Sequence, residues 1–179
     1  MPQVLNVPAD TCEKAPAGGS DCPTFAFLIR HPAHFIALGA GAGLAPVAPG
    51  TFGTLAAIPL ALALRAYFGD AEFIAAVVFL FVAGAWAAQV AGRNLGESDH
   101  GAIVVDEIAA FLLVLFFVGA DWMSVALAFL VFRLFDIWKP PPIRQLDAAI
   151  KNGFGVMLDD LLAAAYTLAV FALWQRVVG

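Results

Sequence analysis

Two pairs of adjacent acidic residues stand beside apolar runs of this sequence, an arrangement that could hold a metal ion. Asp106 and Glu107 open one run, and Asp159 and Asp160 open another. Carboxylates are hard oxygen donors, and Mg²⁺ commonly takes one or two of them while it keeps waters and phosphate oxygens as further ligands. We therefore predict that the two pairs face one another and form a magnesium site that binds metal or activates water. The alternative is that each pair only stabilises the positive N-terminus of a helix.

A third group of charged residues lies in the segment FRLFDIWKPPPIRQLD. Arg133 and Asp136 are three residues apart and would share a helix face, where Asp136 could ligate a metal, act as a base or orient Arg133. Lys139 and Arg144 flank Pro140–Pro142, which should end the helix and form a stiff extended link. These cations could bind phosphate, or they could be ordinary basic residues of the cytoplasmic face.

The glycine-rich segment GAGAGLAPVAPGTFGT and the histidine of DHGAIVVDE are further candidates for contact with a phosphate. Glycines let the backbone approach a ligand, and Thr51 or Thr54 could cap the following helix, whose free N–H groups attract anions. The competing interpretation is a flexible turn before an apolar helix. His100 is a candidate substrate-binding residue, with an ordinary loop histidine as the alternative.

The composition indicates a membrane protein. Of the 179 residues, 62% are hydrophobic and 13% are charged, whereas soluble domains carry about 25% charged residues. The net charge of −5 gives no basic surface, so nucleic acid is not expected as a partner. The length suits one domain: we expect residues 1–24 to form a flexible tail and residues 25–179 to form the membrane-embedded domain.

Five apolar runs are expected to form helices, because they are apolar on every face, unlike the alternating strands of a barrel. Only Phe73–Ala91 approaches the roughly 20 residues that cross a bilayer comfortably, so the other runs need their flanks or burial by neighbours. The sequence thus predicts an all-α integral membrane bundle of four or five apolar helices. Polar residues interrupt Phe25–Leu38, which suits an interfacial helix or a broken entry segment. Besides Phe73–Ala91, the five apolar runs include Leu55–Phe68, Ile108–Ala120, Trp122–Phe132 with a helical pattern continuing to Trp138, and Leu161–Trp174.

The basic residues predict how these helices are oriented, since cytoplasmic loops retain an excess of Lys and Arg. With a cytoplasmic N-terminus and five crossings, seven basic residues fall on the cytoplasmic side and two on the other. The seven are Lys14, Arg30, Arg93, Arg133, Lys139, Arg144 and Lys151, and the two are Arg65 and Arg176. The same topology brings all five acids, Asp136 included, to the cytoplasmic ends of three helices. Ionisable groups at membrane depth are costly, so their convergence indicates function.

Taken in order, four segments resemble the motifs of the phosphatidylglycerophosphatase A family. They are GLAPVAPGTFGTLAAIPL, DHGAIVVDE, FRLFDIWKPPPIRQLD and GFGVMLDDLLAA. The resemblance runs from about Leu38 to Ala165. It implies a Mg²⁺-dependent enzyme of the bacterial inner membrane that removes the terminal phosphate from phosphatidylglycerophosphate to give phosphatidylglycerol.

The resemblance also implies roles for individual residues. It places Asp106 and Glu107 on the family's acidic pair, Asp136 and Lys139 on its Asp-x-Trp-Lys-Pro segment, Asp159 and Asp160 on its final acidic pair, and Thr51 in its Pro-Gly-Thr element. One departure is Ala110, where a glycine often follows the first acidic pair in the family. This change affects helix packing and removes no charged group.

The chemistry expected from these residues is hydrolysis of a phosphate ester. Bound Mg²⁺ would polarise the phosphoryl group and lower the pKa of a bound water, while the cations offset phosphate charge. Direct attack by water is preferred to a phospho-aspartate, because Asp136-Ile137-Trp138 is not a paired-aspartate arrangement. The alternatives are a phosphatase of another lipid or prenyl phosphate, a small transporter component, and a scaffold. Clustering of the acids at one end argues against conduction, and a scaffold would not require it.

Overall fold

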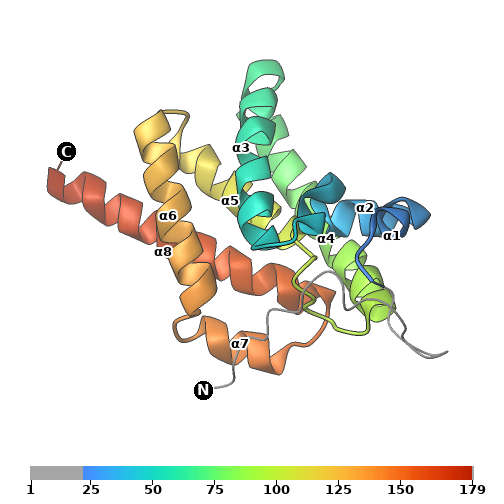
Figure 1. The fold of residues 1–179 in the computed structure, drawn as a ribbon. Coiled ribbons are helices and arrows are strands. Elements are labelled where there is room, and N and C mark those ends of the chain that lie inside the picture. Colours follow the sequence, from blue (N-terminus) through green and yellow to red (C-terminus); the bar gives the residue numbers. More distant parts are fainter. Residues whose placement is uncertain (1–21, 179) are drawn as a thin grey trace.

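The computed structural model describes residues 22–178, which form helices joined by short loops (Figure 1). The predicted all-α fold is confirmed, and no strand is present in this described range. The elements are α1 (Phe25–Arg30), α2 (Pro32–Ala37), the 3-10 helix η2 (Gly39–Leu44), α3 (Pro49–Tyr67), α4 (Asp70–Leu95), α5 (Val105–Val118), α6 (Trp122–Trp138), α7 (Ile143–Ala149) and α8 (Gly153–Val178). The expected tail at residues 1–24 lies almost entirely outside the described residues, and the division at residue 25 stays a prediction.

Three helices of the described chain, α3, α4 and α8, are long and apolar enough to cross a membrane. Helices α4 and α8 each have 26 residues, or about 39 Å of helix, against a hydrocarbon core of about 30 Å. Exposed apolar side chains such as Phe79 and Leu173 suit contact with lipid. The fold is thus an integral membrane bundle. The total of four or five crossings stays a prediction, because α5 and α6 have only 14 and 17 residues.

Helix α5 is the centre of the bundle and lies between α3 and α6 in Figure 1. Most of its residues are buried, and it packs against α3, α4, α6 and α8. Phe111 meets Phe129 of α6 edge to face, with ring centroids 6.1 Å apart. At the other end, Arg65 of α3 donates hydrogen bonds to the carbonyl oxygens of Leu115 and Phe116, at 3.0 and 2.7 Å. A cation at a helix C-terminus is favourable, so these contacts fix α5 and with it the acidic first turn.

The N-terminal segment is broken, which is one of the two alternatives suggested by its interrupted apolar pattern. Helix α1 ends before His31, and Pro32 starts α2. The buried His34 ring stacks on Phe27, with centroids 3.8 Å apart, and its Nδ1 lies 2.8 Å from the Phe27 carbonyl oxygen. Its Nε2 lies 2.7 Å from the Asn94 side chain of α4. His34 therefore links the broken segment to the bundle.

The predicted threonine cap of α3 is wrong. The helix begins at Pro49, and Ala48, whose side chain has no acceptor, occupies the N-cap position. Thr51 and Thr54 lie within the first two turns, where the Thr54 hydroxyl donates to the Gly50 carbonyl oxygen at 2.9 Å. Proline is favoured at the first helical position because its missing N–H would have no helical partner there.

The expected extended link at Pro140–Pro142 is also wrong. These prolines form a turn that is closed by a 2.9 Å hydrogen bond from the Ile143 N–H to the Pro140 carbonyl oxygen. The turn leads directly into the short helix α7, which the sequence did not predict. Because α7 packs against α8, it brings Asp147 to the site described below.

Candidate functional site

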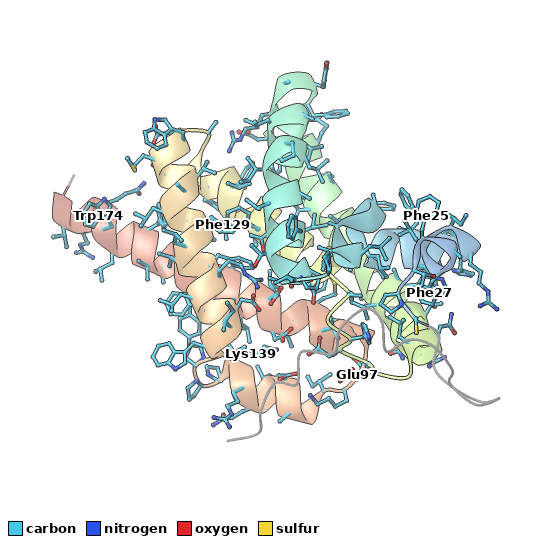
Figure 2. All side chains as sticks on the ribbon, in the orientation of Figure 1. Phe25, Phe27, Glu97, Phe129, Lys139 and Trp174 are labelled. Carbon is cyan, nitrogen blue, oxygen red and sulfur yellow. The ribbon has the colours of Figure 1, made fainter. Side chains whose placement is uncertain are left out.

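Charged side chains from several helix ends meet in a cavity of about 320 Å³. The starts of α3 and α5, the end of α6, the first part of α8 and the loop between α4 and α5 contribute to it. Figure 2 shows oxygen-bearing side chains gathered where these elements meet, near the labelled Lys139. The lining residues are Ala48, Pro49, Gly50, Asp99, Gly101, Ile103, Asp106, Glu107, Arg133, Asp136, Ile137, Lys139, Asp159 and Asp160.

Asp106, Glu107 and Asp160 form a group of inward-facing carboxylates. One oxygen from each lies within 4.8 Å of the others. The atoms Asp106 Oδ1, Glu107 Oε2 and Asp160 Oδ2 are buried and accept no hydrogen bond from any described residue. Buried carboxylates without partners are costly, because nothing offsets their charge. Three converging oxygens of this kind fit a hard divalent cation such as Mg²⁺.

Lys139 lies among a second group of carboxylates, formed by Asp99, Asp147 and Asp159. Its Nζ donates a hydrogen bond to Asp159 and lies 3.5 Å from Asp147 Oδ2 and 4.0 Å from Asp99 Oδ2. Burial alone lowers the pKa of this ammonium, but the hydrogen bond and charge of Asp159, with the two other acids, raise the pKa above its ordinary value. Lys139 therefore stays charged and already supplies the cation of this group.

Arg133 connects the first group of carboxylates with α6. It forms an ion pair with Asp136, three residues further along the same helix, and its Nη1 lies 3.6 Å from Glu107 Oε1. Its Nε is buried and has no hydrogen-bond partner within residues 22–178. A guanidinium presents its donors in a planar fork that matches phosphate oxygens. Arg133 can therefore hold its acidic neighbours and still bind an anion.

The N-terminus of α3 completes the cavity. Ala48, Pro49 and Gly50 line it, and Gly50 lies against Glu107 and Arg133. The first turn of a helix carries partial positive charge, which favours an anion such as phosphate. The cavity thus combines carboxylates for a cation with a guanidinium and a helix end for a phosphate.

The sequence comparisons agree with this geometry. Residues 35–175 match the phosphatidylglycerophosphatase A family. The chain belongs to the phosphatidylglycerophosphatase A family. Membership makes this chain a phosphatase and confirms the resemblance carried by the four motifs.

Three relatives illustrate the match. A phosphatidylglycerophosphatase A of Haemophilus influenzae is 41% identical over 147 residues, covering 81% of this chain and 90% of the relative. One of Escherichia coli is 37% identical over 144 residues, covering 79% and 83%. A Bacteroides thetaiotaomicron protein, provisionally named a phosphatidylinositol-3-phosphatase, is 38% identical over 152 residues, covering 80% and 94%. No solved structure matches the chain.

The structure of this phosphatidylglycerophosphatase A family member brings together most residues predicted for the site. All five acids line the cavity with Arg133 and Lys139. Thr51, His100 and Arg144 lie outside its lining: the His100 Nδ1 accepts a hydrogen bond from the Ala102 N–H in its own loop, and Arg144 is exposed on α7. These three assignments remain predictions without support from the geometry.

The structure separates the second acidic pair, but not the first, from the start of its helix. Asp159 and Asp160 are the seventh and eighth residues of α8, beyond the first turn in which the helix dipole acts. Asp106 and Glu107 do lie in the first turn of α5. Asp159 pairs with Lys139, whereas Asp160 faces Asp106 and Glu107, so the two adjacent aspartates serve different groups.

Two site residues were missed by the sequence reasoning. Asp99 and Asp147 approach Lys139 from the loop before α5 and from α7. Asp99 is the first residue of DHGAIVVDE, and Asp147 is the last residue of FRLFDIWKPPPIRQLD. Their place in segments that resemble the family was the signal that could have identified them. Their convergence depends on the turn at Pro140–Pro142 and on α7, and neither was predicted.

Proposed function

We propose that this chain is a Mg²⁺-dependent lipid phosphatase that hydrolyses phosphatidylglycerophosphate to phosphatidylglycerol and phosphate. The observation that carries the proposal is the group of unpartnered carboxylate oxygens of Asp106, Glu107 and Asp160 beside the unpartnered Nε of Arg133. A cation and a phosphate bound together would satisfy both sets of atoms. The names of the Haemophilus influenzae and Escherichia coli relatives support this substrate.

Asp106, Glu107 and Asp160 would hold the Mg²⁺ ion. When bound, such an ion polarises a phosphoryl oxygen and lowers the pKa of a coordinated water. The residues around it position the substrate: Arg133 binds phosphate oxygens, and Asp136 fixes the orientation of Arg133 through their ion pair. The start of α3 adds partial positive charge. Phosphoryl transfer depends mainly on such positioning and charge stabilisation, so direct attack by water needs no covalent intermediate.

The proposed location is the bacterial inner membrane, with the cavity facing the cytoplasm. The seven-to-two distribution of basic residues supports this orientation. The helix ends support the placement of the cavity at one surface of the membrane, because α3, α5 and α8 begin near the cavity and α6 ends there. A lipid phosphate at the membrane surface would reach the cavity from that side.

The test is phosphate release by the purified protein. We expect Mg²⁺-dependent release from phosphatidylglycerophosphate, abolished by EDTA and restored by added Mg²⁺. Phosphatidate, phosphatidylinositol 3-phosphate and a prenyl pyrophosphate are the comparison substrates. Faster turnover of one of these would indicate that another lipid phosphate is the substrate of this protein, and undiminished turnover in EDTA would refute the metal requirement.

A further inference from the structure

An apolar groove of about 460 Å³ lies between α3 and α6, both of which pack against the central helix α5 (Figure 1). It is lined by aliphatic and aromatic residues. The main contributors are Leu55, Ile58 and Leu62 of α3 and Trp122, Phe129 and Leu130 of α6. Several of these side chains are exposed in the protein alone.

The groove lies next to the charged cavity on α6. On α6, Phe129 precedes Arg133 by four residues, so the two side chains share a face one turn apart. On α3, the groove residues Leu55, Ile58 and Leu62 share one face at spacings of three and four residues, and they begin about 7.5 Å along the helix from Gly50, which lines the cavity. An occupant of the groove would therefore have one end near Arg133.

The charged cavity and the groove together cover about the depth of one leaflet. From Gly50 to Leu62, α3 rises about 18 Å. One leaflet contributes about half of a hydrocarbon core of about 30 Å, or about 15 Å. A molecule with a charged phosphate in the cavity and a hydrocarbon chain in the groove, which covers about 10 Å of α3 from Leu55 to Leu62, fits the combined site.

We propose that the groove between α3 and α6 is a subsite for an acyl chain of the phospholipid whose phosphate lies in the charged cavity, so that substrate enters sideways from the leaflet between these two helices. This inference rests on the proposed function for the cavity. It goes further by naming the entry route and the part of the lipid that is recognised. Ordinary membrane lipids would cover the other exposed apolar faces of the protein, but there the position of the acyl chain would not depend on where the headgroup binds.

A second apolar hollow offers an internal comparison. It has a volume of about 310 Å³ and lies beside another part of α3, where Ala56 and Leu60 face it together with residues of α2, η2, α4 and α5. Arg133 and Asp136 lie on α6, which contributes nothing to the described lining of this hollow. The proposal therefore assigns the chain to the groove between α3 and α6.

The first test measures kcat/KM for dioleoyl and dihexanoyl phosphatidylglycerophosphate in detergent. Ala126, an exposed groove residue, is replaced in Ala126→Trp, while Leu127→Trp alters the neighbouring exposed residue outside the groove and Ala56→Trp fills the second hollow. Ala126→Trp should lower kcat/KM for the long-chain substrate at least about tenfold relative to the short-chain substrate, a difference of about 1.4 kcal/mol. The two other variants should keep the wild-type ratio. An unchanged ratio in Ala126→Trp, or a changed ratio only in Ala56→Trp, would overturn the proposal.

The second test needs no turnover, so it separates this inference from the proposed function. A phosphatidate with a diazirine on its acyl chain is crosslinked to the protein in EDTA and compared with a phosphatidylcholine that carries the same chain. The phosphatidate should label groove residues such as Leu62 and Leu130 more strongly, and Arg133→Ala should remove this preference. Equal labelling by both lipids would show bulk lipid only and would refute the subsite, whereas preferential labelling by a protein that releases no phosphate in the separate assay with Mg²⁺ would retain the subsite and reject the enzymatic proposal.

Discussion

Gly50 of α3 and Glu107 of α5 approach so closely that a Cβ atom at position 50 would overlap the Glu107 carboxylate. The same atom would lie 3.1 Å from Arg133 Nη1. The obstructed group is the end of a flexible side chain, so it can move aside at a small energetic cost. Gly50→Ala should therefore displace the carboxylate proposed to bind metal and leave the fold largely intact.

We predict that Gly50→Ala lowers phosphate release at least about tenfold, which corresponds to about 1.4 kcal/mol of barrier. Its free energy of unfolding should fall by no more than about 1–3 kcal/mol, the usual range for overpacking. The matched control is Gly69→Ala, because a Cβ there would lie 2.8 Å from Glu72 Oε2, another flexible carboxylate, before the start of α4. Equal activity losses in the two variants would argue against a special role for the contact between Gly50 and Glu107.

A second prediction concerns metal binding by Asp106 and Asp160. Asn has nearly the same shape as Asp but lacks the charge that binds a divalent cation, so Asp106→Asn and Asp160→Asn should lower activity at least about 100-fold, or about 2.7 kcal/mol. Both should weaken Mn²⁺ binding, measured by electron paramagnetic resonance on EDTA-treated protein. Asp121→Asn is the control, because Asp121 caps α6 by accepting a 2.9 Å hydrogen bond from the Ser124 N–H. Normal Mn²⁺ binding in the two site variants would indicate that Asp106 and Asp160 have only a structural role.

The sequence predicted the features that depend on local pattern. The apolar runs became α3, α4, α5, α6 and α8, and the two acidic pairs, Arg133 and Asp136 converged as expected. Helix boundaries were less accurate because packing extends a helix beyond its apolar run: α8 begins at Gly153, whose N–H donates a 3.0 Å hydrogen bond to the Gln89 side chain of α4. No local pattern in the sequence reveals such a partner 64 residues away.

The division of the acids into two groups could not be predicted for the same reason. Asp159 and Asp160 are adjacent in sequence, but they project in different directions from α8 because successive helical residues are about 100° apart. Which neighbour each one meets depends on α5 for Asp160 and on the end of α6 for Asp159. The separation follows from tertiary packing rather than from the acidic motif itself.

A third prediction uses the pH dependence of stability. Partial burial raises the pKa of Asp147, but a 3.1 Å hydrogen bond from Lys151 and the charge of Lys139 outweigh this effect and hold the pKa below its ordinary value. Stability contributed by such a carboxylate is present above its ordinary pKa of about 3.9 and is lost as the pH falls through the folded-state value. Asp147→Asn should therefore unfold at a lower temperature than wild type at pH 6 to 7. The difference should shrink below about pH 4, and a constant difference down to pH 3 would contradict this account.

The last prediction separates the roles of the two cations at the C-terminal end of α6. The sequence alone assigned both Arg133 and Lys139 to phosphate. In the structure, three carboxylates surround Lys139, whereas Arg133 keeps a buried Nε without a partner in the described part of the chain. Phosphate recognition should therefore depend mainly on Arg133, and Lys139 should mainly hold Asp99, Asp147 and Asp159 together.

We expect Arg133→Lys, which keeps the charge beside Glu107 but loses the planar fork, to lower kcat/KM at least about 100-fold, with a melting temperature within a few degrees of wild type. Lys139→Met should show the opposite pattern. It leaves three neighbouring carboxylates without their cation, and the loss of a charged hydrogen bond worth about 2 kcal/mol would lower the melting temperature by about 4–8 °C. Turnover per folded molecule should fall much less than in Arg133→Lys. Thermal unfolding in detergent and phosphate release below the melting temperature of both variants measure the two effects separately. A stable but inactive Lys139→Met would return Lys139 to the phosphate site, because a residue that only neutralises carboxylates would affect folding first.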